Sequence, residues 1–410
     1  MKNISRSSIF GIKIDFEKSK GSMLYDKITN REFIDFFGMY ATVALGYNHP
    51  IFSTEEFQKS ILNVAKCKIT NCEMLSDEAE NFNKLFTDYV SIGGKFTHFH
   101  YSCTGALAIE AALKTAFDYK GLPNPTVITF KESFHGINGY GGFLTTRQGP
   151  VGTRLNGFPG PFWTQLDNPV ITYNNGIPEK NLDRVESTLS DLEQIINTEN
   201  SNVAAILVEP IQCTFGDKYF SNEFFQGLRK IADTYNIPLI FDEVQIGFGG
   251  TGKLWYFEHL GIEPDILVFG KKVQVAGIMV KEKFTKIFQT PVRLEVTWDA
   301  DIVDMVRSSF VIEAYQKFDI LKNVNIMSSL LIEGLKKTKN LRNIRSTGLI
   351  IAFDFDNEEK RNDFWKKLFD KGLICNKSLD KTIRLRPNLN VNEEEIHKAL
   401  AIINNVDNLL

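Results

Sequence analysis

The sequence reads VAAILVEP at residues 203–210, SNEFFQGLRKIADTYN at 221–236 and IPLIFDEV at 237–244, and this alternation decides the fold. The first and third runs are apolar at almost every position, which is typical of strands buried on both faces of a parallel sheet. The middle run carries an apolar stripe at helical spacing behind a serine N-cap. TVITF (126–130) and DILVFG (265–270) extend the pattern. We therefore predict an α/β domain with a mostly parallel sheet of about seven strands and helices on both faces.

The segments on either side of this region read differently. MLYDKITNREFIDF (23–36) predicts a hairpin with its turn at Lys27–Asn30. We assign residues 60–310 to a large domain, and residues 1–59 with 311–410 to a smaller, discontinuous α+β domain. The further predicted elements are a helix near 302–318, strands at 349–355 and 382–387, a helix at 356–372, and a last helix that opens with Asn392 and Glu395 in capping-box positions.

Composition excludes several classes of protein. The 410 residues are 43% hydrophobic and 24% charged, with a net charge of -3, so no basic excess points to nucleic acid. No apolar run is long enough to span a membrane, and the N-terminus does not read as a signal peptide. The five cysteines are scattered and odd in number, which favours a reducing compartment. We expect a cytoplasmic protein without a metal site.

Polar side chains follow three of the predicted strands at their carboxyl ends, where ligands bind in open α/β sheets. Asp242 and Gln245 follow one strand, Lys271 and Lys272 follow the next, and Glu209 follows a third. One interpretation of a lysine and an aspartate at one buried edge is an ordinary salt bridge with no further role. The alternative is a cofactor site, in which a desolvated lysine is the nucleophile and the carboxylate pairs with a protonated ring nitrogen.

The segment YSCTGALAIEAALKTAFDYKG predicts a short polar turn followed by an amphipathic helix. Gly105 and Ala106 would present backbone N–H groups at the positive end of the helix dipole, where a phosphate binds well, and Thr104 would add a hydroxyl. An ordinary capped helix is the alternative reading of this segment.

Five blocks of the sequence, taken together, resemble the class III (subgroup II) aminotransferases of pyridoxal phosphate (PLP) fold type I. The blocks are GALAIEAALK, ESFHG (132–136), VEPIQ (208–212), LIFDEVQIGFGGTGKLW (239–255) and PDILVFGKK (264–272). Three further segments resemble the L-lysine 6-aminotransferases: FGKKVQVAG (269–277), RLEVTWDADIVDMVR (293–307) and TIRLRPNLNV (382–391). The resemblance covers essentially the whole chain and implies PLP as the cofactor.

The resemblance also implies individual cofactor roles. Lys271, in preference to Lys272, would be the Schiff-base lysine and would move the substrate proton. Asp242 would pair with the ring nitrogen, Gln245 would donate to the 3-oxygen of the ring, and Phe134 would lie on the ring face. The remaining cofactor contacts implied are Thr104, Gly105 and Ala106 at the phosphate, His135 and Glu209 around the ring, and Thr297 at the phosphate of the neighbouring subunit in a homodimer.

For the substrate, the resemblance implies that Arg384 binds a carboxylate. The reaction implied is the transfer of a terminal amino group from lysine or a lysine-like amine to 2-oxoglutarate, by a ping-pong mechanism. Lysine aminotransferases usually carry an arginine where Ile137 stands, and Arg147 or Arg154 could replace it. Thr214 and Glu295 also stand where the family usually carries other residues, so the donor remains open. A PLP enzyme of the same fold with another amine substrate, including a racemase or epimerase, is the alternative. A non-enzymatic relative is disfavoured because the cofactor residues are all present.

Overall fold

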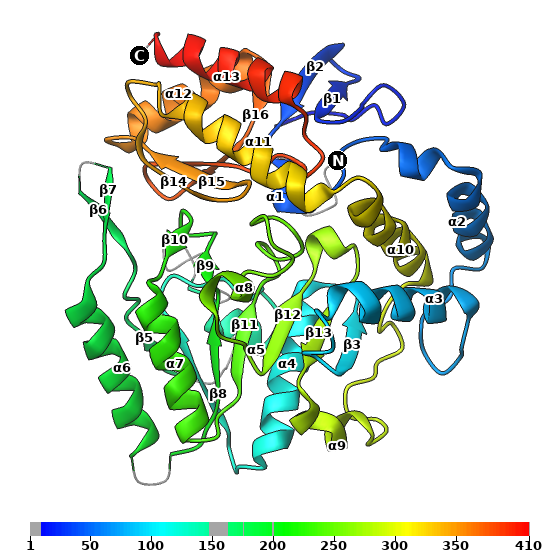
Figure 1. Cartoon of the computed structure of the whole chain (residues 1–410), viewed down its shortest axis with the longest axis vertical. Helices are drawn as coiled ribbons and strands as arrows, with labels where there is room; N and C mark the ends of the chain where they lie inside the picture. Colours follow the sequence, from blue (N-terminus) through cyan, green and yellow to red (C-terminus); the bar gives the residue numbers. More distant parts are fainter. Residues whose placement is uncertain (1–9, 147–162, 175, 199–200, 410) are drawn as a thin grey trace.

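A seven-stranded sheet forms the centre of the lower part of the molecule in Figure 1. The computed structural model describes residues 10–146, 163–174, 176–198 and 201–409. Strand β13 runs antiparallel to its two neighbours, and the other neighbouring pairs are parallel. In spatial order the strands are β3 (His98–Ser102), β13 (Ala276–Val280), β12 (Ile266–Phe269), β11 (Leu239–Asp242), β8 (Val203–Val208), β4 (Thr126–Phe130) and β5 (Gln165–Leu166). The predicted α/β fold with a mostly parallel sheet is confirmed.

Both faces of this sheet are covered, which explains the continuous apolar runs of its strands. In β8, Ala205 and Leu207 belong to the core under one face, whereas Ile206 and Val208 belong to the core under the other. Helix α4 (Gly105–Lys120) packs on the first face and α7 (Asn222–Thr234) on the second. As predicted, the Ser221 side chain caps α7, by accepting a hydrogen bond from the Phe224 N–H. The other helices of this part are α5 (Gly139–Leu144), α6 (Leu182–Ile196), α8 (Phe257–Leu260) and α9 (Thr285–Phe288).

Two smaller sheets form the upper part of Figure 1. One is antiparallel, in the order β14 (Arg342–Thr347), β15 (Ile350–Asp354), β18 (Thr382–Leu385) and β17 (Asn376–Ser378). The other contains the hairpin of β1 (Met23–Asp26) and β2 (Arg31–Asp35), whose turn is the predicted one. Strand β2 pairs in parallel with β16 (Leu373–Ile374), so the N-terminal hairpin is built into the C-terminal part of the chain. The domain boundaries at residues 60 and 310 remain a prediction.

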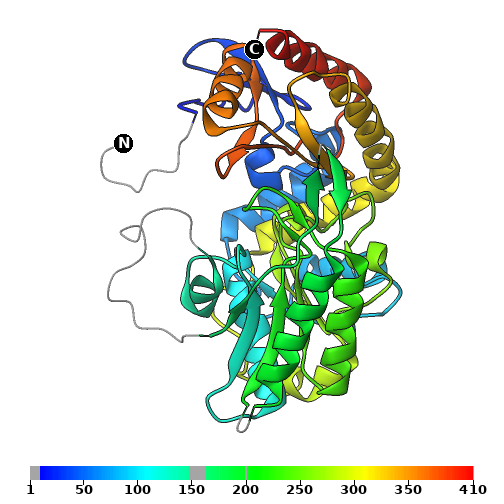
Figure 2. The same ribbon diagram turned by 90° about the vertical axis from the view of Figure 1, so that its left-hand side faces the viewer.

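Long helices connect and cover the two parts. Helix α10 (Ile302–Lys317) packs against α2 (Glu55–Cys67) and α3 (Asp77–Leu85), and α11 (Ile320–Leu335) continues into the upper part. Figure 2 shows the C-terminal helix α13 (Glu393–Asp407) on the outer surface of that part. α12 (Glu358–Asp370) packs against α13, and the predicted capping box of Asn392 and Glu395 is present. Among the residues placed by the structure, no helix combines the length and apolar character needed to cross a bilayer.

Candidate active site

Three neighbouring parallel strands end at one edge of the large sheet. β11 ends at Asp242, β12 is followed by Gly270 and Lys271, and β8 is followed by Glu209. The pairing of β11 with both neighbours brings these polar residues together, as the sequence predicted.

Asp242 is buried and held by two contacts. Its Oδ2 lies 2.9 Å from Nδ1 of His135, and its Oδ1 accepts a hydrogen bond of 3.1 Å from the Val244 N–H. The other ring nitrogen of His135 lies 3.2 Å from the Thr129 hydroxyl. His135 is therefore fixed between β4 and the carboxylate, and it sets the orientation of Asp242.

The two adjacent lysines point to different surroundings. Burial lowers the pKa of Lys271, and the nearby Cys213 and Asp242 side chains oppose this shift. The Lys271 backbone has a φ of 50°, a left-handed conformation that is costly for a non-glycine residue and is typical of functional sites. Lys272 points away and donates to the Gln245 carbonyl at 2.6 Å. The charge of Asp242 therefore acts on Lys271, whereas the Lys272 ammonium is bound by the Gln245 carbonyl.

Glu209 connects this edge to the loop that carries Phe134. Its carboxylate accepts a hydrogen bond of 2.6 Å from the Phe134 N–H. Burial and then the charge of Asp242 raise the pKa of Glu209. The Phe134 ring itself is 40% exposed, so it offers an accessible aromatic face beside the buried carboxylates.

The start of α4 lies beside the same edge. The Thr104 hydroxyl accepts from the Leu107 N–H at 3.2 Å, which caps the helix, and Gly105 is its first residue. A Cβ on Gly105 would lie 3.0 Å from the Val244 side chain, two residues beyond Asp242. Glycine therefore allows the N–H groups of Gly105 and Ala106 to approach the site closely. Thr297 is exposed, and the next residue, Trp298, accepts a 3.2 Å hydrogen bond from Cys103 at its carbonyl.

Arg384 lies in β18 and is buried. Its Nη1 donates to the Cys213 carbonyl, and its Nε has no hydrogen-bond partner among the described residues. Burial and then the neighbouring Arg386 guanidinium lower the pKa of Arg384. A buried cation with a spare donor is suited to a bound anion.

The structure assigns local contacts to the other substrate residues. The Thr214 carbonyl accepts from the Ser378 hydroxyl at 2.6 Å, and the Ile137 side chain is 59% exposed. The Glu295 carboxylate accepts from the Arg293 and Leu294 N–H groups at 2.8 and 3.0 Å, which stabilises its own turn. Arg147 and Arg154, which the sequence offered as substitutes for a missing arginine, lie outside the described residues.

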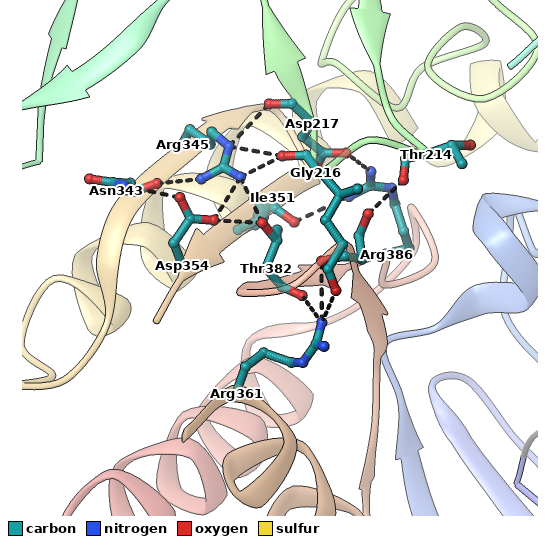
Figure 3. A network of polar contacts seen from close by, with 12 residues as sticks. Thr214, Gly216, Asp217, Asn343, Arg345, Ile351, Asp354, Arg361, Thr382 and Arg386 are labelled. Atoms are coloured by element: carbon teal, nitrogen blue, oxygen red, sulfur yellow. Dashed lines mark hydrogen bonds and ion pairs between the residues drawn. The ribbon is translucent and has the colours of Figure 1, made fainter. Parts of the chain in front are cut away.

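The sequence does not predict the buried polar network that contains Asp217, Arg345 and Arg386 (Figure 3). Asp217 pairs with Arg386, and Arg345 pairs with Asp354. The alternating arginines of TIRLRP are the available signal, but two partners of Arg386, Ile351 and Asp217, lie far away in the chain.

Comparison with known proteins identifies the family. A profile of the family described as aminotransferase class-III matches residues 6–406. An L-lysine-epsilon aminotransferase of Mycobacterium tuberculosis is 31% identical over 96% of this chain and 91% of its own length. Its counterpart from Amycolatopsis lactamdurans is 30% identical, over 95% and 91%. The structure of a lysine aminotransferase from M. tuberculosis aligns with a TM-score of 0.90 at 30% identity, covering 97% of this chain and 94% of that one.

The chain belongs to the class III aminotransferases. It is therefore a PLP-dependent enzyme, and the family, the aminotransferase class of enzyme and the cofactor predicted from its sequence are confirmed. The residues of this aminotransferase fit PLP: a lysine with lowered pKa for the aldehyde, a buried carboxylate for the ring nitrogen and a helix N-terminus for the phosphate.

Proposed function

We propose that this aminotransferase transfers a terminal amino group from lysine or a lysine-like amine to 2-oxoglutarate by a ping-pong mechanism. The observation that carries the proposal is Arg384, whose buried guanidinium has a donor to spare for the carboxylate of an oxo acid. The two relatives named L-lysine-epsilon aminotransferase support a lysine-like donor.

Each proposed catalytic role follows from the contacts of the residue. Lys271, with its lowered pKa, would hold the cofactor and then carry the proton to and from the substrate carbon. Asp242, oriented by His135, would keep the ring nitrogen protonated. When bound, PLP supplies the electron-accepting ring that stabilises negative charge on that carbon. Phe134 would cover one face of the ring, and Gln245 would hold its 3-oxygen.

The remaining cofactor contacts are proposed at the phosphate. Gly105 and Ala106 would bind it through their N–H groups, with the Thr104 hydroxyl beside them. Thr297 would reach the phosphate of a second subunit. All five cysteines are free thiols, which supports the proposed cytoplasmic location.

The donor is proposed from the residues that would surround it. Ile137 cannot pair with a carboxylate, and losing an arginine–carboxylate pair costs about 2–5 kcal/mol. Glu295 and Asp299 would add negative charge near the substrate, although the Asp299 carboxylate also accepts from the Val296 N–H at 2.7 Å. A diamine, or a lysine- or ornithine-like compound with a cationic far end, would then be preferred to free lysine.

A comparison of lysine, ornithine, cadaverine and putrescine tests this proposal. With the donor alone, the cofactor absorbance should change once and stop, and 2-oxoglutarate should restore it, as a ping-pong mechanism requires. Arg384→Ala should raise the KM for 2-oxoglutarate by about a hundredfold or more. An unchanged KM in Arg384→Ala would refute the carboxylate assignment, and turnover of none of the four amines would refute the donor class.

A further inference from the structure

The loop between β9 (Ile211–Gln212) and β10 (Lys218–Tyr219) is fastened to the four-stranded sheet through its own carbonyl groups. The acceptors are nearly consecutive, and each donor is a side chain of that sheet. The Cys213 carbonyl accepts from Arg384, the Thr214 carbonyl from Ser378 at 2.6 Å, and the Gly216 and Asp217 carbonyls from Nε of Arg345 at 3.1 and 3.0 Å. Figure 3 shows the loop above the strands that supply these donors.

Two buried ion pairs hold this arrangement. The Asp217 and Arg386 side chains are 0% and 3% exposed. Burial alone would lower the pKa of Arg386, but the Asp217 carboxylate more than offsets it and raises the pKa. Arg345 pairs with Asp354 at 3.0 Å, and the Thr382 hydroxyl donates to the same carboxylate at 2.7 Å. Because separating either pair would leave a buried charge without a partner, the loop has little freedom to move.

Arg384 is the unpaired cation of this cluster. The two aspartates of the cluster, Asp354 and Asp217, are each paired with another arginine. Among the described residues, the hydrogen-bond partner of Arg384 is the neutral Cys213 carbonyl. That carbonyl occupies one nitrogen of the guanidinium and so fixes which donors remain for a ligand. The placement of Cys213 therefore controls how Arg384 is presented.

We propose that Asp217 and Arg345 are positioning residues for Arg384 in the recognition of the oxo-acid carboxylate. They act by fixing the Cys213–Asp217 loop, and neither touches the carboxylate itself. The inference rests on the proposed function, in which Arg384 binds that carboxylate. It assigns a part in substrate specificity to two residues that are not among the proposed cofactor contacts.

The first test uses Arg345→Gln in the holoenzyme. The expected result is an increase of about tenfold in the KM for 2-oxoglutarate and in the Kd for glutarate, a non-reacting dicarboxylate, since a hydrogen bond to a charged group is misaligned. The kcat at saturation should change by less than about twofold, because chemistry at Lys271 is untouched. Arg345→Lys should recover part of the affinity. An unchanged Kd for glutarate in a folded, PLP-loaded Arg345→Gln enzyme would overturn the proposal.

Asp217→Asn supplies a second test, in which the direction of the change in glutarate affinity decides the outcome. It keeps an acceptor for Arg386 but removes a negative charge close to Arg384. A purely electrostatic effect would tighten glutarate binding, whereas loss of positioning weakens it. Weaker binding by isothermal titration calorimetry supports the proposal, and equal or tighter binding overturns it.

The matched control is Asp265→Asn. Asp265 lies directly before β12, whereas Lys271 follows the other end of that strand. Asp265 forms a pair of similar burial with Arg229 at 3.0 Å. This variant should lower stability and leave the Kd for glutarate unchanged; a similar rise in Kd would make the effect on Arg384 non-specific and overturn the proposal. Arg384→Ala distinguishes a failure of the proposed function from a failure of the positioning role. If Arg384→Ala keeps its affinity for glutarate, the proposed function is wrong. If Arg384→Ala loses affinity but the Arg345 and Asp217 variants do not, only the positioning role is wrong.

Discussion

At the scale of single residues, the direction of two adjacent side chains separates their chemistry. Lys271 faces the buried carboxylates, whereas Lys272 donates to the Gln245 carbonyl. Both lysines belong to the short 3-10 helix Lys271–Val273, in which successive side chains point in different directions because there are about three residues per turn. In the sequence only the family resemblance distinguishes the two lysines, whereas in the structure their contacts differ.

We expect borohydride reduction of the holoenzyme to attach the cofactor irreversibly to Lys271. The reason is that Lys271 combines a lowered pKa with proximity to Asp242. Peptide mapping by mass spectrometry would locate the modification. Recovery of the label on Lys272, or on neither lysine, would contradict the assignment.

Lys272 should make stability depend on pH. Burial and then the charge of Lys271 lower its pKa to about 7. Above pH 7 the folded chain therefore holds Lys272 neutral while the unfolded chain still binds its proton, so the free energy of unfolding rises with pH until the ordinary lysine pKa. The slope from one such group is about 1.4 kcal/mol per pH unit.

Lys272→Met should lower the slope by about 1.4 kcal/mol per pH unit between pH 8 and pH 10, as measured by urea unfolding, and Lys271, whose pKa is also lowered, should keep its own contribution. The window starts at pH 8 because burial raises the pKa of Glu243 to about 8, which contributes a slope of opposite sign below that value. An equal slope in the wild type and Lys272→Met would show that Lys272 is not neutral in the folded enzyme.

At the scale of elements, the last helix joins the two ends of the chain. In its capping box the Asn392 side chain accepts from the Glu395 N–H at 2.9 Å, and Glu395 accepts from the Asn392 N–H at 3.0 Å. Glu395 also accepts from the N–H and hydroxyl of Ser22 at 2.7 and 2.9 Å. One carboxylate therefore caps α13 and fixes the segment that leads into the N-terminal hairpin.

These contacts predict that substitutions of Asn392 and Glu395 lower the free energy of unfolding by different amounts. Asn392→Ala removes a cap and should lower the free energy of unfolding by about 1 kcal/mol. Glu395→Ala also leaves the buried Ser22 N–H unsatisfied and should cost about 3 kcal/mol. Urea unfolding of both variants measures the difference. Equal losses would mean that the contact with Ser22 contributes nothing.

At the scale of the whole molecule, exposed apolar side chains lie at the start of α4 and on two segments that single contacts connect to it. Thr70 bridges to Asp301, and the Cys103 thiol donates to the Trp298 carbonyl, so residues 69–75 and 292–298 lie close to that helix. A patch of this kind is typical of a protein interface. Its members are Ile69, Met74, Leu75, Leu107, Val292, Val296 and Trp298.

We expect this patch to be the contact between two subunits of the proposed homodimer. Leu75 is 87% exposed, and Leu75→Lys should weaken the dimer and reduce PLP retention together, since Thr297 of one subunit would serve the phosphate of the other. Ile28→Lys is the control, because Ile28 is 64% exposed in the hairpin turn. Sedimentation velocity with cofactor absorbance measures both. A fully active monomer would contradict the dimer.

Sequence alone determined the fold class and pointed to most of the residues that are proposed to bind the cofactor. The sheet could be predicted because burial on two faces makes a strand apolar at every position, and this pattern is local. Asp242, Lys271 and Glu209 could be grouped because each directly follows such a strand. The caps on Ser221 and Asn392 were equally readable, since an N-cap and its partners lie within one turn of helix.

Only the tertiary structure decided how Arg384 is held. Its carbonyl partner on Cys213 is 171 positions away, and Arg345 reaches Gly216 across 129 positions. Neither spacing leaves a local pattern, because hydrogen bonds between a loop and a distant sheet depend on how the two parts of the chain pack together. Glu295 illustrates the same limit, since its position in the sequence suggests a charge near the substrate, and only the folded turn shows that this carboxylate also accepts from two neighbouring N–H groups.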